Sequence, residues 1–232
     1  METSLDTKQN KTFEASDLQS LYQTRFRGML EYRNKVWRVL IRDYFQQWVR
    51  PGDVVLDLGA GYGEFINNIQ CAEKYALDLN PDTAHRANTD VKAIQQDCSK
   101  PWPLPDNSLD VVFTSNFFEH LPDKQALART LAEAKRCLKP DARLIAMGPN
   151  IKYLPGAYWD FLDHYVPLTE NSLSEALEQQ DFRIEKCLDK FLPFTMVNGP
   201  QYPVFFIALY LRLPLAWRIL GKQFLILAKK RE

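Results

Sequence analysis

The stretch VVLDLGAGYGEF, residues 54–65, decides the fold of this chain. Apolar residues of strand character end in three glycines, Gly59, Gly61 and Gly63, and an acid follows them directly. Glycines between a strand and a helix let the backbone approach a nucleotide closely, because no Cβ intervenes. The stretch therefore predicts a nucleotide-binding turn at the carboxyl end of a strand in an α/β sheet.

The acid of this stretch, Glu64, indicates which kind of nucleotide the turn holds. A dinucleotide places its pyrophosphate on the helix N-terminus, but Glu64 stands where that fingerprint has its third glycine. A half-buried carboxylate would repel the pyrophosphate by roughly 1 kcal/mol or more. With Asp57 on the strand before it, the turn suits a ligand without phosphate and with a positive end. S-adenosylmethionine is such a ligand; the open alternatives are a nicotinamide dinucleotide and a plain tight turn.

Strand-like and helical segments alternate beyond this turn. We expect strands at 53–58, 74–79, 91–97, 109–116 and 142–149, and helices at 64–70, from Pro81 and at 123–138. This alternation predicts a mostly parallel sheet with helices on both faces, and the continuous apolar strands fit burial on both sides. The ligand should lie outside the carboxyl ends of the strands.

The two ends of the chain carry further predicted elements. An amphipathic helix is expected from Leu30 to Trp48, and Pro51-Gly52 stops it. We expect its aromatic stripe, which includes Trp37, to pack in the core, and its basic face to be solvated or to recognise an anionic substrate. Beyond residue 150 we expect a helix from Thr169 to about Gln180, strands at 182–191 and 222–230, and between the strands an apolar, proline-rich segment at 193–216.

Size and composition indicate one globular domain. The chain has 232 residues, 46% of them hydrophobic and 25% charged, with a net charge of zero, so no overall field favours nucleic acid. We expect a disordered tail at 1–15 and one domain at 16–232, divided into a helical lid (16–50), a cofactor-binding core (52–150) and substrate-capping segments with closing strands (151–232). The polar N-terminus, the absence of an apolar run near 20 residues and four dispersed cysteines predict a cytoplasmic, reduced protein.

Acids follow the second and third predicted strands. Asp78 ends the second strand, where a carboxylate can accept hydrogen bonds from both ribose hydroxyls; a dinucleotide site would have an acid there too. Asp97-Cys98 ends the third strand, where the carboxylate can accept from an adenine amino group and a backbone N–H can meet a ring nitrogen. An ordinary loop cap is the alternative for Asp97. Both acids are consistent with a nucleoside ligand.

The segments VLDLGAGYGEF, ALDLNPD, QQDCSKPWPLPDNSLDVVFTSNFFEHL and RCLKPDARLIAMGPN together resemble class I S-adenosylmethionine-dependent methyltransferases of the small-molecule type, densely over residues 52–150. The resemblance implies a Rossmann-like three-layer αβα sandwich with a seven-stranded sheet of order 3-2-1-4-5-7-6, the last strand antiparallel. It implies contacts to the methionine end from the glycine turn, to ribose from Asp78 and to adenine from Asp97. The predicted cofactor residues are Asp57, Gly59, Ala60, Gly61, Gly63, Glu64, Asp78, Leu79, Asp97, Cys98 and Asn116.

Two histidines are candidate general bases. His120 follows the fourth strand, beside the expected methyl group, and His164 follows Asp163, which is a candidate to orient it. The alternative is that both hold loops in place; His85 is expected to be solvated. The predicted lid and substrate residues are Arg27, Tyr32, Arg33, Phe117 and Tyr165, with Tyr22 beside them. The spacing of Asp106, Asp110, Glu119 and His120 fits no metal-binding pattern, so we expect no metal.

These features predict methyl transfer from S-adenosylmethionine to a small molecule, at a hydroxyl oxygen of a saccharide-type or other biosynthetic precursor. A softer resemblance of residues 163–182 to a bacterial subgroup that modifies saccharides or other envelope precursors suggests that acceptor. The alternative is a protein of the same fold that binds S-adenosylmethionine, or serves as a scaffold, without catalysis. Three roles remain open for the apolar 203–216 segment: a lid helix, a dimer face or an interfacial membrane contact.

Overall fold

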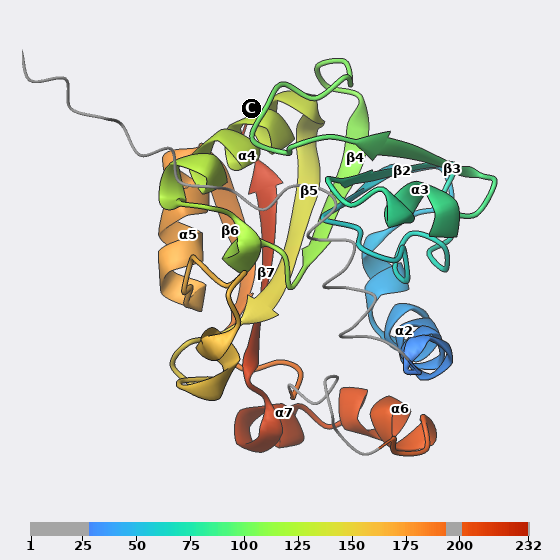
Figure 1. The fold of residues 1–232 in the computed structure, drawn as a ribbon, viewed down its shortest axis with the longest axis vertical. Coiled ribbons are helices and arrows are strands. Elements are labelled where there is room, and N and C mark those ends of the chain that lie inside the picture. Colours follow the sequence, from blue (N-terminus) through green and yellow to red (C-terminus); the bar gives the residue numbers. More distant parts are fainter. Residues whose placement is uncertain (1–27, 194–200, 232) are drawn as a thin grey trace, which may run out of the picture.

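The computed structural model describes residues 28–193 and 201–231, and a seven-stranded sheet forms its centre (Figure 1). The strands are β1 (Val54–Leu58), β2 (Glu73–Asp78), β3 (Val91–Gln95), β4 (Leu109–Ser115), β5 (Leu138–Pro149), β6 (Phe182–Leu188) and β7 (Gln223–Lys230). Their order is β3-β2-β1-β4-β5-β7-β6, and β7 runs antiparallel to both of its neighbours while the other pairs are parallel. This confirms the predicted order and the antiparallel last strand.

Helices cover both faces of the sheet, as the alternating pattern predicts. The longer helices are α2 (Leu30–Asp43), α4 (Lys124–Cys137) and α5 (Glu170–Gln179); the shorter are η1 (Phe45–Trp48), α3 (Asp82–Arg86), η2 (Phe118–His120), η3 (Ala157–Asp160), α6 (Phe205–Leu211) and α7 (Pro214–Leu220). Leu56 and Leu58 of β1 belong to the hydrophobic cluster of α4 and α5, whereas Val55 belongs to that of α2, α6 and α7. Alternate side chains thus enter opposite layers, which confirms the three-layer sandwich.

Aromatic packing holds α2 against the sheet. Trp37 is buried, and its ring lies edge-on to Phe65 and Phe113, at 6.2 and 6.0 Å between ring centroids. Phe65 follows the glycine turn and stacks on Phe113 of β4 at 3.6 Å. The predicted core role of the stripe is therefore confirmed. These contacts also fix the turn between α2 and β4.

Side-chain caps begin the two helices of the opposite layer. Asp123 accepts a hydrogen bond from the backbone of Ala126 at 2.6 Å and starts α4. Thr169 and Ser172 form a reciprocal capping box at the start of α5, as the predicted N-cap requires. Each cap satisfies backbone N–H groups that have no partner within the helix.

The predicted helix over 64–70 is wrong, since consecutive turns occupy this segment. In a helix the backbone N–H of Asn68 would bond to the carbonyl oxygen of Glu64. The side-chain Nδ2 of Asn68 takes that oxygen instead, at 2.8 Å, while its backbone N–H donates to Phe65. The neighbouring Asn67 is bonded to Arg86 and Asn88 of the α3 region. Asparagine side chains compete with helical hydrogen bonds in this way.

The chain after residue 188 departs from the predicted strand at 182–191. It leaves the sheet at Leu188, and the apolar segment forms α6 and α7, of which α6 packs against α2. Within the described residues, no helix is long and apolar enough to cross a bilayer. The four cysteines have no disulfide partner among the described residues. The tail at 1–15, Tyr22 and Arg27 lie outside the described residues.

Candidate cofactor and catalytic site

The three glycines of the turn all adopt positive φ, at +69° for Gly59, +54° for Gly61 and +74° for Gly63. Gly59 must also lack a side chain, because a Cβ at this position would lie 2.1 Å from Cγ of Phe117. The loop after β4 therefore lies directly against the loop after β1. Only glycine permits this approach of the two loops.

Asp78 ties the glycine turn to the end of β2. Its Oδ2 accepts a hydrogen bond from the backbone N–H of Gly61 at 2.7 Å, and its Oδ1 accepts one from Asn80 at 2.8 Å. Burial raises the pKa of Asp78, although these N–H donors and the nearby His120 oppose the rise. The carboxylate is thus held in one orientation at the place where the sequence predicts the ribose contact.

A cavity of about 170 Å³ opens at the carboxyl ends of β2, β3 and β4. It brings together seven of the predicted residues: Asp78, Leu79, Asp97, Cys98, Phe117, His120 and Tyr165. Asn80 and Gln96 also line it, and the sequence analysis did not single them out. Their place directly after the predicted strand ends was the signal that could have identified them. The predicted adenosine-binding residues and one predicted base therefore share a single cavity.

The side chain of Asp97, at the end of β3, is bonded within its own loop. The carboxylate of Asp97 is exposed and accepts hydrogen bonds from the N–H and the hydroxyl of Ser99, both at 2.8 Å. This geometry is the loop cap that was the alternative for Asp97. Cys98 is buried, and its burial raises the pKa of the thiol to about 12. Cys98 is therefore a neutral wall of the cavity at neutral pH.

Two buried amides test whether a nucleoside fits here. Nδ2 of Asn80 and Oδ1 of Asn116 are both buried without a hydrogen-bond partner in the described part of the chain. Asn80 lines the cavity, and Asn116 precedes Phe117 with a φ of +49°. A buried donor and acceptor without partners cost free energy unless a ligand satisfies them. Of the two, the Asn80 amide lines the cavity, where it fits an adenosine-type ligand with ring nitrogens and hydroxyls.

Carboxylates surround the other end of the glycine turn. Asp57 of β1 is buried, which raises its pKa; the N–H of Ile66 opposes the rise, and the charges of Glu64 and Asp78 add to it. Nε of Arg33 on α2 donates a hydrogen bond to Oε1 of Glu64 at 2.6 Å, and the two side chains form an ion pair. A cation bound at the turn would favour ionised Asp57. Because Glu64 is paired with Arg33, Asp57 is the carboxylate here that would favour the sulfonium or ammonium group of S-adenosylmethionine.

Of the predicted lid residues, Tyr32 and Arg33 lie on α2, where the described basic face is largely paired. Tyr32 packs against the core of the α2 layer. Lys35 pairs with Glu31 at 2.7 Å, and Arg42 with Asp43 at 2.6 Å. A polar cavity of about 500 Å³ lies between α2 and α3, and its lining includes Asn34, Arg38, Tyr62, Glu64, exposed His85 and Arg86.

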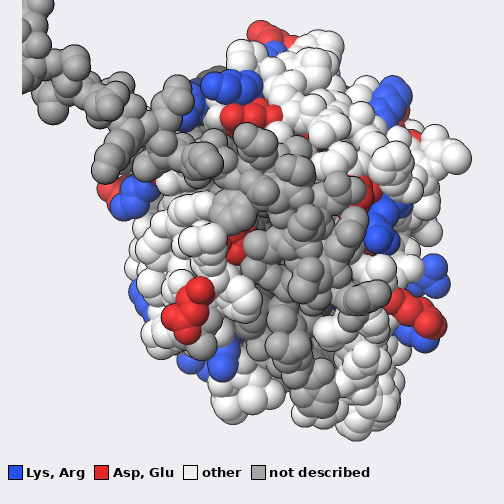
Figure 2. Space-filling view, viewed as in Figure 1, with Lys and Arg blue, Asp and Glu red and all other residues white. Residues whose placement is uncertain are grey.

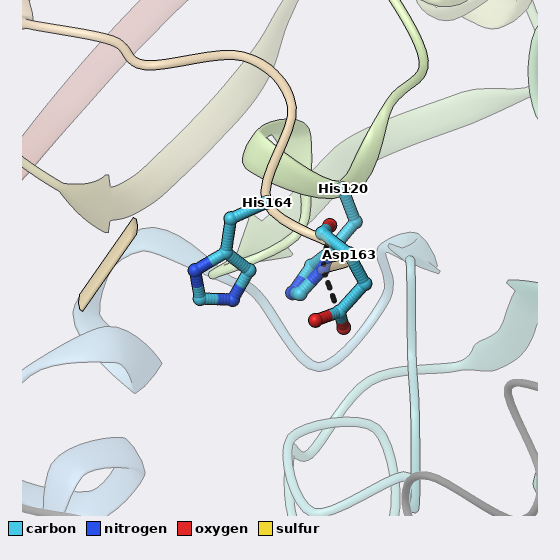
Figure 3. Close-up of side chains that lie close together, drawn as sticks. All are labelled: His120, Asp163 and His164. Atoms are coloured by element: carbon cyan, nitrogen blue, oxygen red, sulfur yellow. Dashed lines mark hydrogen bonds and ion pairs between the residues drawn. The ribbon is translucent and has the colours of Figure 1, made fainter. Parts of the chain in front are cut away.

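A cluster of His120, Asp163 and His164 forms beside the cofactor cavity (Figure 3). Nδ1 of His120 lies 2.9 Å from the backbone oxygen of Asp163 and 3.2 Å from its carboxylate Oδ2. Burial by itself lowers the pKa of His120, but the Asp163 carboxylate and the Glu119 charge outweigh it, so the pKa is raised overall. His120 and Asp163 line the cavity, whereas His164 is not among its lining residues.

Backbone pairing brings the two parts of this cluster together. The N–H groups of Tyr165 and Val166 donate to the carbonyl oxygen of Glu119, at 2.8 and 3.1 Å. Buried Glu119 also accepts a hydrogen bond from the Tyr158 hydroxyl at 2.7 Å. His164 contacts the carbonyl oxygen of Tyr158 through Nδ1 at 2.6 Å and stacks on the Tyr158 ring at 4.3 Å. Of the two predicted bases, His164 is thus engaged in holding the loop.

The same three side chains meet the distance requirement for a metal site. One ligand atom from each lies within 4.8 Å of the others, and this is the only such group among the described residues. The acids weighed from sequence lie elsewhere, since Asp106 pairs with Arg136 and Asp110 with Lys139. The contact of His120 with Asp163 already satisfies Nδ1 without an ion. The expectation of no metal stays a prediction.

Known proteins match both the sequence and the fold of this chain. The family model described as "Methyltransferase domain" matches residues 56–146. The 27-O-demethylrifamycin SV methyltransferase of Amycolatopsis mediterranei is 32% identical over 108 residues, which cover 41% of this chain and 38% of that protein. The matched stretches span between 27% and 56% of the length of the curated relatives.

Solved structures extend the match over nearly the whole chain. A SAM-dependent methyltransferase from Archaeoglobus fulgidus gives a TM-score of 0.62 at 24% identity, over 91% of this chain and 99% of that one. A chain in the complex with the Haloferax volcanii Trm112 methyltransferase activator gives a TM-score of 0.68 at 18% identity, over 95% of this chain and 98% of that one. These likenesses are of fold. With the glycine turn and the family match over residues 56–146, they show that this chain has the fold of class I S-adenosylmethionine-dependent methyltransferases and contains a region similar to their methyltransferase domain.

Proposed function

We propose that this protein transfers a methyl group from S-adenosylmethionine to a hydroxyl oxygen of a small acceptor, such as a saccharide-type or other biosynthetic precursor. The observation that carries the proposal is His120, held by Asp163 on the wall of the cavity that also contains Asp78. The printed name of the Amycolatopsis relative, an O-demethylrifamycin methyltransferase, supports an oxygen acceptor on a small molecule.

The contact with Asp163 determines which nitrogen of His120 can accept a proton. A carbonyl oxygen can only accept a hydrogen bond, so Nδ1 of neutral His120 carries the hydrogen that it donates to Asp163. Nε2 then keeps its lone pair and is the basic atom. When Nε2 takes a proton, the carboxylate of Asp163 stabilises the imidazolium. This pair has the base-and-orienter arrangement that activates hydroxyl groups.

The acceptor hydroxyl must lose its proton as its oxygen gains the methyl group. When bound, S-adenosylmethionine supplies a methyl group on a positively charged sulfur, which becomes a neutral thioether as the carbon–sulfur bond breaks. His120 receives the hydroxyl proton, so the new ether leaves uncharged. Asp78 and Asn80 would hold the nucleoside, and Phe117 lies against Gly59 at the turn. Orientation and exclusion of water supply the rest of the acceleration.

Binding and turnover test the proposal in two steps. Calorimetry with S-adenosylhomocysteine should show binding, and its absence at millimolar ligand would refute the cofactor site. Acceptors that differ only in a hydroxyl or an amine at the same position are then incubated with S-adenosylmethionine, and S-adenosylhomocysteine release is measured. Turnover of the hydroxyl compounds is expected. Binding without turnover would instead support the non-catalytic alternative, and turnover of amines alone would reject the oxygen acceptor.

A further inference from the structure

An apolar surface lies on α6 and α7, which we call the α6–α7 face. Seven large apolar side chains of this segment are exposed: Phe205, Phe206, Leu209, Leu213, Leu215, Ile219 and Leu220. Leu215 and Ile219 are 74% and 79% exposed. Soluble monomers rarely expose apolar patches larger than a few hundred Å², and such patches mark contact sites. The face plays no part in the cofactor cavity.

These helices are anchored to the protein by their opposite side. Val204, Ile207, Ala208 and Leu211 recur at helical spacing and pack into the hydrophobic cluster of α2. Trp217 of α7 is buried, and its Nε1 donates to the carbonyl oxygen of Tyr210 at 2.9 Å. Both sides of the segment are therefore apolar, but only one side meets the core. The outer side chains are held outward by packed helices.

The charged side chains within this segment of the sequence have one sign. From Lys190 to Arg231 the sequence contains no Asp or Glu, in a chain whose 29 acids balance 29 bases overall. Arg212, Arg218 and Lys222 are exposed on or beside the two helices. The backbone oxygen of Arg218 accepts a hydrogen bond from Nζ of Lys190 at 3.1 Å, which keeps a fourth base beside α7. Apolar side chains with bases among them fit a partner that is apolar inside and anionic outside.

The two helices lie together at one end of the molecule. Figure 1 shows α6 and α7 side by side below the sheet, and the described atoms at that end are mostly uncharged in Figure 2. Each helix has seven residues, and no helix in the described ranges could span a bilayer. A pair of short helices at one end can lie flat on a surface without disturbing the sheet.

We propose that the α6–α7 face docks on an anionic lipid bilayer, with the two helices in the plane of the headgroups. Leu215, Ile219 and Phe205 enter the acyl boundary, and Arg212 and Arg218 meet lipid phosphates. A second copy of this chain fits less well. A two-fold contact would bring the arginines of one copy against those of the other, with no acid in the segment to compensate.

Vesicle sedimentation tests the docking surface. Full-length protein is mixed at low salt with phosphatidylcholine vesicles that contain or lack phosphatidylglycerol, and pelleting is measured. We expect pelleting with the anionic vesicles and its reduction at high salt. The double variant Leu215→Asp/Ile219→Asp should stay in the supernatant. Arg212→Gln with Arg218→Gln should bind about thirtyfold more weakly, since each base near the surface contributes about 1 kcal/mol.

Matched variants outside the α6–α7 face distinguish docking by this face from non-specific adsorption to vesicles. Leu162→Asp changes a leucine that is 76% exposed on another loop, and Lys100→Gln with Lys124→Gln removes two exposed charges elsewhere. These should pellet like the unmodified protein. Equal pelleting by all variants, or none by the unmodified protein, overturns the proposal. So does a stable dimer that the Asp double variant converts to monomer without any vesicle binding.

Discussion

Asp163 contacts His120 through two different oxygens, and the two contacts have separable effects. The backbone oxygen sets which nitrogen carries the hydrogen, because it can only accept. The carboxylate raises the pKa of the imidazole, because it stabilises the charged form. A side-chain substitution therefore removes the second effect and keeps the first.

Replacing His120 by Gln removes the proposed base. We expect kcat for a hydroxyl acceptor to fall by about 10²–10⁴, the usual contribution of general base catalysis. The affinity for S-adenosylhomocysteine, measured by calorimetry, should change little. His164→Gln is the matched control, because His164 lies outside the cavity lining and should lose much less. Unchanged turnover in His120→Gln would show that His120 only holds the loop.

Replacing Asp163 by Asn tests the pKa argument. The base must be neutral, so the rate should rise with pH through the pKa of His120, which lies above its ordinary value. Without the carboxylate the charged form loses support, so this rise should move to lower pH, and kcat should fall less than in His120→Gln. Asp160→Asn, on the same loop, should leave the profile in place. A shift to higher pH in Asp163→Asn would contradict the assignment.

At the scale of elements, sequence patterns predicted the structure wherever local and tertiary preferences agree. Apolar strands and capped helices such as α4 carry their signal within a few residues. The helix predicted at 64–70 does not form, because the side chains of Asn67 and Asn68 bond to groups that only the fold brings near. The His120–Asp163 contact spans 43 residues and depends on backbone pairing at Glu119. The spacing of residues along the chain could not predict this contact.

The capping box of α5 gives a test at this scale. Thr169→Ala removes the acceptor for the N–H of Ser172, and the free energy of unfolding should fall by about 1 kcal/mol in urea denaturation. Ser174→Ala, inside the same helix, should cost less because it removes no cap. Equal losses in the two variants would indicate that helix propensity, rather than capping, accounts for the effect.

The proposed methyl transfer should not require a divalent ion. Nδ1 of His120 donates to Asp163, so a metal could bind this ring only at Nε2, where it would occupy the lone pair that accepts the hydroxyl proton. Dialysis against EDTA is therefore expected to leave the turnover of a hydroxyl acceptor unchanged, and added Mg²⁺, Mn²⁺ or Zn²⁺ should not raise it. Loss of turnover with EDTA and its recovery with one ion would show instead that His120, Asp163 and His164 form a metal site.

Cofactor choice can be measured on the stability of the whole molecule. A ligand at one hundred times its Kd raises the unfolding free energy by about 2.7 kcal/mol, and each kcal/mol raises Tm by about 2–4 °C in a domain of this size. S-adenosylhomocysteine should therefore raise Tm by about 5–10 °C. NADH should not, because Glu64 stands at the position of the third glycine of the dinucleotide fingerprint. Asp78→Asn should abolish the shift if Asp78 binds ribose, whereas Asp90→Asn, exposed at the surface, should keep it. A comparable shift with NADH would overturn this reading of the glycine turn.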